Sequence, residues 1–162
     1  QASIYNSIYY TKYHLFTENI IGALKFYGAN VTAIEDDVRL SKRLHIPSRR
    51  LRGFESHKVG PKDGTDYVGG NYATALSFET ALPNLLPEST QTDVAIFMDM
   101  GNLWGVDYDS SINASNGIRS SIGVSSNVYT PIGPLSFVFA KPISEVSTDK
   151  TQTFKFQIGT SF

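Results

Sequence analysis

Apolar and polar side chains alternate along much of the chain, and the last ten residues, TFKFQIGTSF (153–162), show the pattern in its simplest form. One set consists of Phe154, Phe156, Ile158, Thr160 and Phe162, and the other of Lys155, Gln157, Gly159 and Ser161. Successive side chains of a β-strand point to opposite faces, so this segment is predicted to be a strand with one apolar and one polar face. A terminal aromatic residue on the apolar face requires an apolar environment.

The same alternation recurs along the chain without helical periodicity, and it predicts an all-β fold of seven antiparallel strands. The segments are 4–16, 20–34, 70–81, 93–101, 118–131, 133–142 and 152–162. In the third segment, Leu76 and Phe78 share one face. Ser77 and Glu79 share the other face. The apolar faces are continuous, whereas the opposite faces are small, polar or charged.

This pattern fits both a soluble β-sandwich and a membrane β-barrel. Two features favour the barrel. The strands have about 10 to 14 residues, which suits a tilted crossing of a bilayer better than the usual 5 to 6 residues. Short connections such as 17–19 and 130–134 alternate with the long polar connections 35–69 and 102–117, as in outer-membrane barrels. The short connection 143–151 is expected to form a hairpin on the side of the long loops.

Seven is an odd number of strands, whereas bacterial outer-membrane barrels have an even number. The chain also begins on a strand-like stretch, QASIYNSIYY, which lacks the basic and apolar regions of a signal peptide. We therefore expect the chain to be the C-terminal portion of a larger barrel.

Composition excludes several functions of this 162-residue chain. The net charge of −1 provides no broad basic field for nucleic acid, and the absence of cysteine excludes disulfides and thiol nucleophiles. No nucleotide-binding or hydrolase motif occurs. His14, His45 and His57 lack the spacing of metal ligands. We predict neither an enzyme nor a cofactor or metal site.

The long loop 35–69 contains the most specific signal. A loop of this length without regular structure is more often functional than idle. Leu51, Arg52, Gly53 and Phe54 match the motif [VIL]-R-G-[FY] of the BamA family of outer-membrane assembly factors, the bacterial surface antigen proteins. The chain also resembles that family, in the right order, in GP (60–61), DG (63–64), GGN (69–71), DMGNLWG (99–105), TPIGPLSF (130–137), AKP (140–142) and FKFQIGTSF (154–162).

The resemblance implies that residues 1–162 are the last seven strands of a sixteen-stranded transmembrane barrel, and that the POTRA domains of the family are absent from this chain. It implies that loop 35–69 folds back into the lumen, where Arg52 meets Glu79 and Asp99. A guanidinium can satisfy two carboxylates at once and stays charged at any relevant pH. The chain departs from the family pattern at HIPSRR (45–50), just before the motif, and at Ser136, where many members have arginine.

The function implied by the resemblance is insertion of β-barrel proteins into the bacterial outer membrane by lateral opening and strand templating. The expected partners are unfolded outer-membrane proteins, periplasmic lipoproteins of the assembly complex and outer-membrane lipid, with no nucleic acid. The terminal strand resembles the β-signal of outer-membrane proteins, with Phe154, Phe156, Ile158, Gly159 and Phe162 as its residues. Arg119 is expected to be a charge on the lumen wall without chemistry attached.

Two alternatives stay open. A secretion pore of the two-partner type, or a TamA-like translocation pore, shares the motif of the long loop, and the number of upstream domains would distinguish it. A soluble β-barrel that binds small ligands predicts a protein that is monodisperse without detergent, whereas a membrane protein aggregates without an amphiphile.

Overall fold

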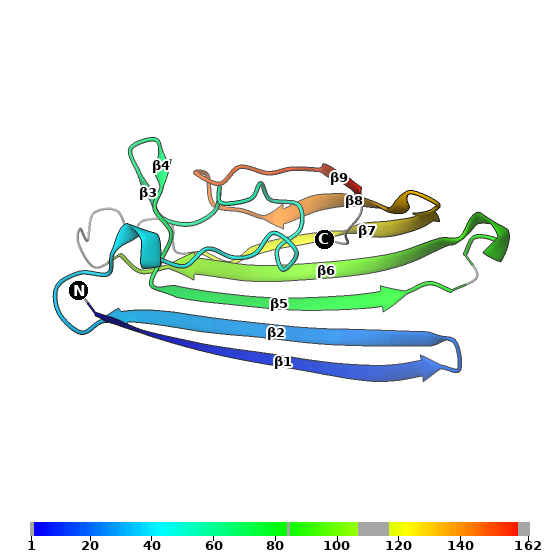
Figure 1. Ribbon diagram of the computed structural model, residues 1–162, viewed down its shortest axis with the longest axis horizontal. Helices are drawn as coiled ribbons and strands as arrows, with labels where there is room; N and C mark the ends of the chain where they lie inside the picture. Colours follow the sequence, from blue (N-terminus) through cyan, green and yellow to red (C-terminus); the bar gives the residue numbers. More distant parts are fainter. Residues whose placement is uncertain (1, 84, 107–116, 159–162) are drawn as a thin grey trace.

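The protein forms one antiparallel sheet with a long loop across one of its faces (Figure 1). This computed structural model describes residues 2–83, 85–106 and 117–158. The sheet has seven strands in the order β1-β2-β5-β6-β7-β8-β9. Their bounds are Ser3–Thr17 for β1, Ile20–Ala33 for β2, Tyr72–Ala81 for β5, Thr92–Trp104 for β6, Arg119–Thr130 for β7, Gly133–Ser144 for β8 and Phe154–Ile158 for β9.

The seven predicted strands are confirmed, because each predicted segment overlaps one strand of the sheet and consecutive strands of the sheet pair antiparallel. Within the described part of the chain, β1 and β9 form the two edges and each pairs on one side only. Closure into a sixteen-stranded barrel stays a prediction. Among the described residues, no helix is long and apolar enough to cross a membrane.

The two faces of the sheet differ as the alternation predicts. The inner face, which the long loop covers, carries small and polar residues such as Ala73, Ser77 and Ser121, all nearly inaccessible. The outer face carries large apolar residues; Ile122 and Phe139 are 51% and 55% exposed. An exposed apolar face of this extent would make a soluble protein aggregate, whereas lipid solvates it. The distribution favours the membrane barrel over the soluble alternative.

We call residues 34–71, between β2 and β5, the docking loop. The loop contains a short helix, η1 (Leu40–Lys42), and a hairpin of β3 (Lys62–Asp63) and β4 (Asp66–Tyr67). Outside this loop, a second short helix, η2 (Glu88–Thr90), lies between β5 and β6. The prediction that loop 35–69 lacks regular structure was therefore wrong in detail. Strands of two residues are too short to show a period in the sequence.

The main hydrophobic core lies between the docking loop and the inner face of β2, β5 and β6. Its members from the loop are Val38, Leu44, Ile46, Leu51, Phe54 and Val59, and its members from the strands are Tyr27, Val31, Ala73, Ala75 and Leu103. Small alanines on the strands leave room for the larger loop side chains. Burial of this apolar surface, at about 25 cal/mol per Å², holds the loop against the sheet.

Candidate functional site

The tip of the docking loop carries the Leu51–Phe54 motif and presses it onto the inner face. Leu51 and Phe54 are only 2% and 4% exposed and anchor the tip on either side of Arg52. Gly53 has a φ of +92°, a conformation that favours glycine. An added Cβ there would lie 3.1 Å from the Cβ of Ala140 and 3.2 Å from that of Ser121. Glycine therefore permits both the turn and the close approach that aim Arg52 at the sheet.

Asp99 on β6 is the main partner of Arg52. The Nε and Nη2 atoms of Arg52 donate to the two carboxylate oxygens of Asp99 at 2.7 and 2.9 Å, and the backbone N–H of Arg52 donates to Oδ2 at 2.9 Å. Ser77 donates a further hydrogen bond to Oδ1 at 2.6 Å. The side chain of Asp99 is 0% exposed, so these four donors replace its hydration completely.

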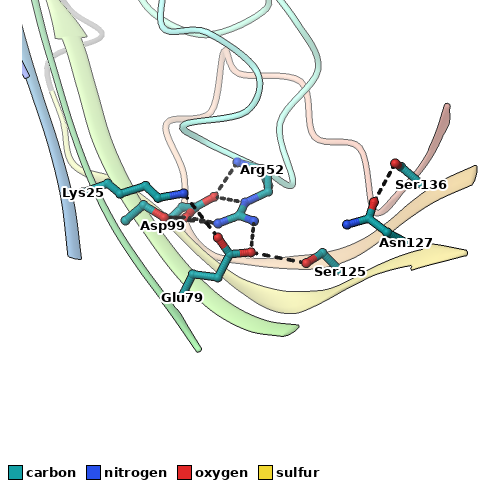
Figure 2. A network of polar contacts seen from close by, with 8 residues as sticks. Lys25, Arg52, Glu79, Asp99, Ser125, Asn127 and Ser136 are labelled. Atoms are coloured by element: carbon teal, nitrogen blue, oxygen red, sulfur yellow. Dashed lines mark hydrogen bonds and ion pairs between the residues drawn. The ribbon is translucent and has the colours of Figure 1, made fainter. Parts of the chain in front are cut away.

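Glu79 on β5 is a secondary, wetter partner of Arg52 (Figure 2). The Nη1 atom of Arg52 donates to Glu79 Oε1 at 3.2 Å, and the Glu79 side chain is 24% exposed. Lys25 on β2 lies 3.6 Å from the other oxygen of the same carboxylate. Arg52, Lys25, Glu79 and Asp99 thus form a charge-balanced cluster across three strands. The structure brings together the three residues that the resemblance relates, and their part in function stays a prediction.

An aromatic platform lies under the guanidinium of Arg52. The Cζ atom of Arg52 lies 3.7 Å from the centre of the Phe97 ring, which is within the range of a cation–π contact. Gly123 on β7 makes room for that ring, because an added Cβ would lie 2.7 Å from the ring atom Cζ of Phe97 and 2.1 Å from the backbone oxygen of Phe139. Sequence reasoning missed both residues. Phe97 has the same strand parity as Asp99, and an aromatic residue on a polar face was the available signal.

The electrostatics keep the guanidinium charged. Burial lowers the pKa of Arg52, but the hydrogen bonds and charge of Asp99, with a further contribution from Glu79, outweigh burial and raise that pKa above its ordinary value. The cluster can therefore hold the loop by a permanent charge.

The segment HIPSRR, where the sequence departs from the family pattern, docks through Arg50 and Ser48. The Arg50 guanidinium lies 5.2 Å from the ring centre of Tyr9 and 5.1 Å from that of Tyr27. Ser48 accepts a hydrogen bond from Lys155 of β9 at 3.1 Å. Ser136, the second departure, is 1% exposed and donates to Asn127 at 2.7 Å.

The terminal strand places its aromatic side chains on the outer face. Phe154 and Phe156 are each 46% exposed, and Ile158 is 58% exposed. The rings of Phe156 and Phe154 lie 5.2 and 4.8 Å from those of Phe137 and Phe139 respectively, between ring centres. Gly159 and Phe162, the other two residues predicted for the β-signal, lie outside the described residues.

A second buried ion pair lies at the start of β7. Arg119 donates from Nε and Nη2 to Asp149 at 2.8 and 3.1 Å, and both side chains are 0% exposed. Arg119 lies on the inner face, as expected for a charge on the lumen wall, and the connection between the antiparallel strands β8 and β9 lies against the docking loop, as expected for 143–151. The pairing of Arg119 with Asp149 of that connection was not predicted. A pairing across 30 residues leaves no local trace in the sequence.

His45 and His57 meet in the docking loop with their ring centres 4.6 Å apart. Burial, and to a lesser extent the charge of His57, lowers the pKa of His45. In the part of the chain that the structure describes, no group of three or more His, Asp or Glu side chains is placed to hold a metal ion.

Comparison with known proteins identifies the family of the chain. The Omp85 superfamily domain matches residues 5–162. The outer membrane protein assembly factor BamA of Neorickettsia risticii is 34% identical over 115 residues, which are 69% of this chain and 16% of that protein. The protein of the same name from Neisseria meningitidis is 29% identical over 139 residues, again 69% of this chain and 17% of that protein.

A solved structure shares the fold. The crystal structure of BamA from Haemophilus ducreyi lacking POTRA domains 1–3 superimposes with a TM-score of 0.81, over 95% of this chain and 34% of that chain, at 22% sequence identity. The chain spans about a sixth of the length of the curated relatives it matches.

Proposed function

Because the chain belongs to the Omp85 superfamily and its BamA family, we propose that it is the C-terminal barrel portion of an outer-membrane protein assembly factor. The protein is located in the outer membrane of a Gram-negative bacterium. The proposed partners are unfolded outer-membrane proteins, periplasmic lipoproteins and lipid. The proposed action is physical, with no covalent bond made or broken.

The problem that such a factor solves is the cost of unpaired backbone groups in lipid, several kcal/mol for each group. A strand at the edge of a sheet offers a row of such groups and can pair with an incoming strand. We propose that β9 lines a seam of the closed barrel, that the seam opens sideways, and that substrate strands add there. The free edge of β9 supports this proposal, because β9 pairs only with β8 within the described part of the chain.

The observation that carries the proposal is the docking of Arg52. One loop arginine connects carboxylates of two neighbouring strands, β5 and β6, and its backbone carbonyl accepts a hydrogen bond from Ser121 of a third strand, β7. These contacts fix strand positions on the inner wall. We propose that they keep this part of the barrel rigid while the seam moves.

A depletion and rescue experiment tests the proposal. The full-length protein is depleted in its host and replaced by wild type, by Arg52→Ala or by Arg49→Ala, and the folded, heat-modifiable fraction of several unrelated outer-membrane barrels is measured. Arg49 is the matched control, because it is an exposed arginine three residues away in the same loop. We expect depletion to lower all barrels, Arg49→Ala to restore them and Arg52→Ala to restore them poorly at equal protein level.

Two outcomes would contradict the proposal. If the barrels stay folded while one secreted protein is lost, the protein is a dedicated exporter. If Arg52→Ala restores the barrels as fully as wild type does, the docked arginine has no part in assembly.

A further inference from the structure

The β8–β9 connection, residues 145–153, receives the tip of the docking loop through backbone hydrogen bonds. Glu55 N–H donates to the oxygen of Lys150 at 2.9 Å, and Gln152 N–H donates to the oxygen of Gly53 at 2.9 Å. These two bonds flank an antiparallel bridge between Phe54 and Thr151. The segment that follows Arg52 is therefore paired like a short extra strand with the chain that leads into β9.

Asp149 organises this connection from its centre. Its Oδ2 accepts the N–H of Val146 at 3.0 Å, which closes the turn of the connection. Its Oδ1 lies 3.4 Å from the N–H of Gly60, which belongs to the docking loop. The hydroxyl of Tyr67, on β4, also donates to the backbone oxygen of Thr148 next to it. One carboxylate thus lies where the connection and the loop meet.

Arg119 neutralises that carboxylate and has no exposed surface of its own. Besides its two bonds to Asp149, its Nη1 donates to Asn102 Oδ1 at 2.7 Å and to the oxygen of Gly117 at 2.9 Å. Since neither member of the pair contacts water, loss of either one leaves a buried charge without a partner. The wall strand β7 therefore determines the shape of the connection on which the loop docks.

We infer that Arg119 and Asp149 form a positioning latch, which holds the β8–β9 connection in the shape that receives the Arg52 loop and fixes the start of β9. The latch acts through the docked loop, so its importance for assembly rests on the proposed function. Arg119 touches neither Arg52 nor its carboxylates in the contacts described, and its effect passes through residues 149–152.

The test measures loop docking directly, by disulfide formation in the full-length protein with Glu55→Cys and Lys150→Cys. Both side chains are exposed, they face each other in the register of the Phe54–Thr151 bridge, and these 162 residues contain no other cysteine. Opposed residues of an antiparallel pair have Cα atoms about 5.5 Å apart, within the range of a disulfide. The rate of cross-linking with a mild oxidant then reports how often the loop is docked.

We expect Asp149→Asn and Arg119→Gln each to lower the cross-linking rate about tenfold or more, as loss of one partner of a buried pair would. The double variant should be no worse than the worse single one. Asp66→Asn is the matched control, an exposed carboxylate of the same loop, and should leave the rate unchanged. Arg119→Lys keeps the charge but loses the paired N–H donors of the guanidinium, so its cross-linking rate should be intermediate.

An unchanged rate in Asp149→Asn and Arg119→Gln overturns the latch. If these variants fail to fold, as judged by their own heat-modifiability, Arg119→Lys decides, and a wild-type rate in that variant overturns the proposal. Once the disulfide has formed, the Asp149→Asn variant should again assemble other barrels. Reduction of the disulfide should abolish this recovered activity. If the cross-linking rate falls while assembly of other barrels stays normal, the latch is supported. The same result would contradict the proposed role of the docked loop in assembly.

Discussion

The Arg52 and Arg119 sites use the same chemistry under different conditions. Both arginines hold one carboxylate with two hydrogen bonds. Arg119 and Asp149 are completely buried, whereas Arg52 is 9% exposed and borders a polar cavity of about 330 Å³ that also reaches Glu79 and Ser125. Arg52 comes from the loop and meets the wall, while Arg119 comes from the wall and meets a connection.

This difference makes the Arg52 contact easier to open than the Arg119 contact. At the Arg52 site, the polar cavity is large enough to admit water, and Lys25 lies near enough to compensate Glu79 when the loop leaves. At the Arg119 site, separation of the charges would leave both without any solvent or second partner charge, which is far more costly. We therefore expect the Arg52 contact to open more often than the Arg119–Asp149 pair, whose opening leaves two buried charges without partners.

The largest effect should follow loss of the dry carboxylate at the Arg52 site. In Asp99→Asn the guanidinium loses its main counter-charge, and a buried ionic group left without a partner costs about 3–5 kcal/mol. Hydrogen exchange of the Arg52 and Glu55 amides, both bonded in the docked loop, should accelerate by about a hundredfold or more. Exchange at the wild-type rate would show that the loop docks without Asp99.

A smaller but clear effect should follow crowding of the aromatic platform under Arg52. In Gly123→Ala the new Cβ collides with the Phe139 backbone oxygen and with the ring of Phe97, and such overpacking costs about 1–3 kcal/mol. The thermal unfolding midpoint in detergent measures the loss. Gly28→Ala is the control, since a Cβ there meets only side-chain atoms at 3.3 Å or more. Equal midpoints for both variants would contradict the close packing of Gly123 against β8 and the Phe97 ring.

The comparison also shows what the sequence could predict. The seven strands and their faces follow from a period of two, which is a local property that each segment carries by itself. The relation of Arg52 to Glu79 and Asp99 came from the resemblance to a family, because the contacts join residues 27 and 47 positions apart.

The Arg119–Asp149 pair had no such guide. Asp149 lies in a short polar connection, where a solvated carboxylate is the usual outcome, and Arg119 lies on a polar strand face that suits a wall charge. Only the fold shows that the connection turns inward, because the partner of Asp149 depends on the register of β7 and β8 and on a loop more than 80 residues away. Local patterns determine faces, whereas partners across the sheet depend on the assembled topology.

Substitution of the wetter carboxylate should cost less and would show that the two acids are unequal. Glu79→Gln removes one charge but keeps an acceptor for Arg52, at a site with 24% exposure, so we expect a loss of about 1 kcal/mol. Hydrogen exchange of the Arg52 amide should accelerate by about fivefold, far less than in Asp99→Asn. A loss as large as that of Asp99→Asn would mean that both carboxylates hold the loop equally.

The smallest expected effect is a pH dependence of loop docking, which arises from His45 and His57 and not from the two arginine sites. Because burial and the nearby His57 lower the pKa of His45, the docked loop favours the neutral imidazole. The stability that this contributes is complete above the ordinary histidine pKa of about 6.5 and is lost as the pH falls through the lower pKa of the docked state. The Arg52 and Glu55 amides, corrected for intrinsic exchange, should therefore lose protection as the pH falls below about 6.5. His45→Gln should flatten this profile and His57→Gln should weaken it, whereas an unchanged profile in both would assign the pH dependence to the carboxylates.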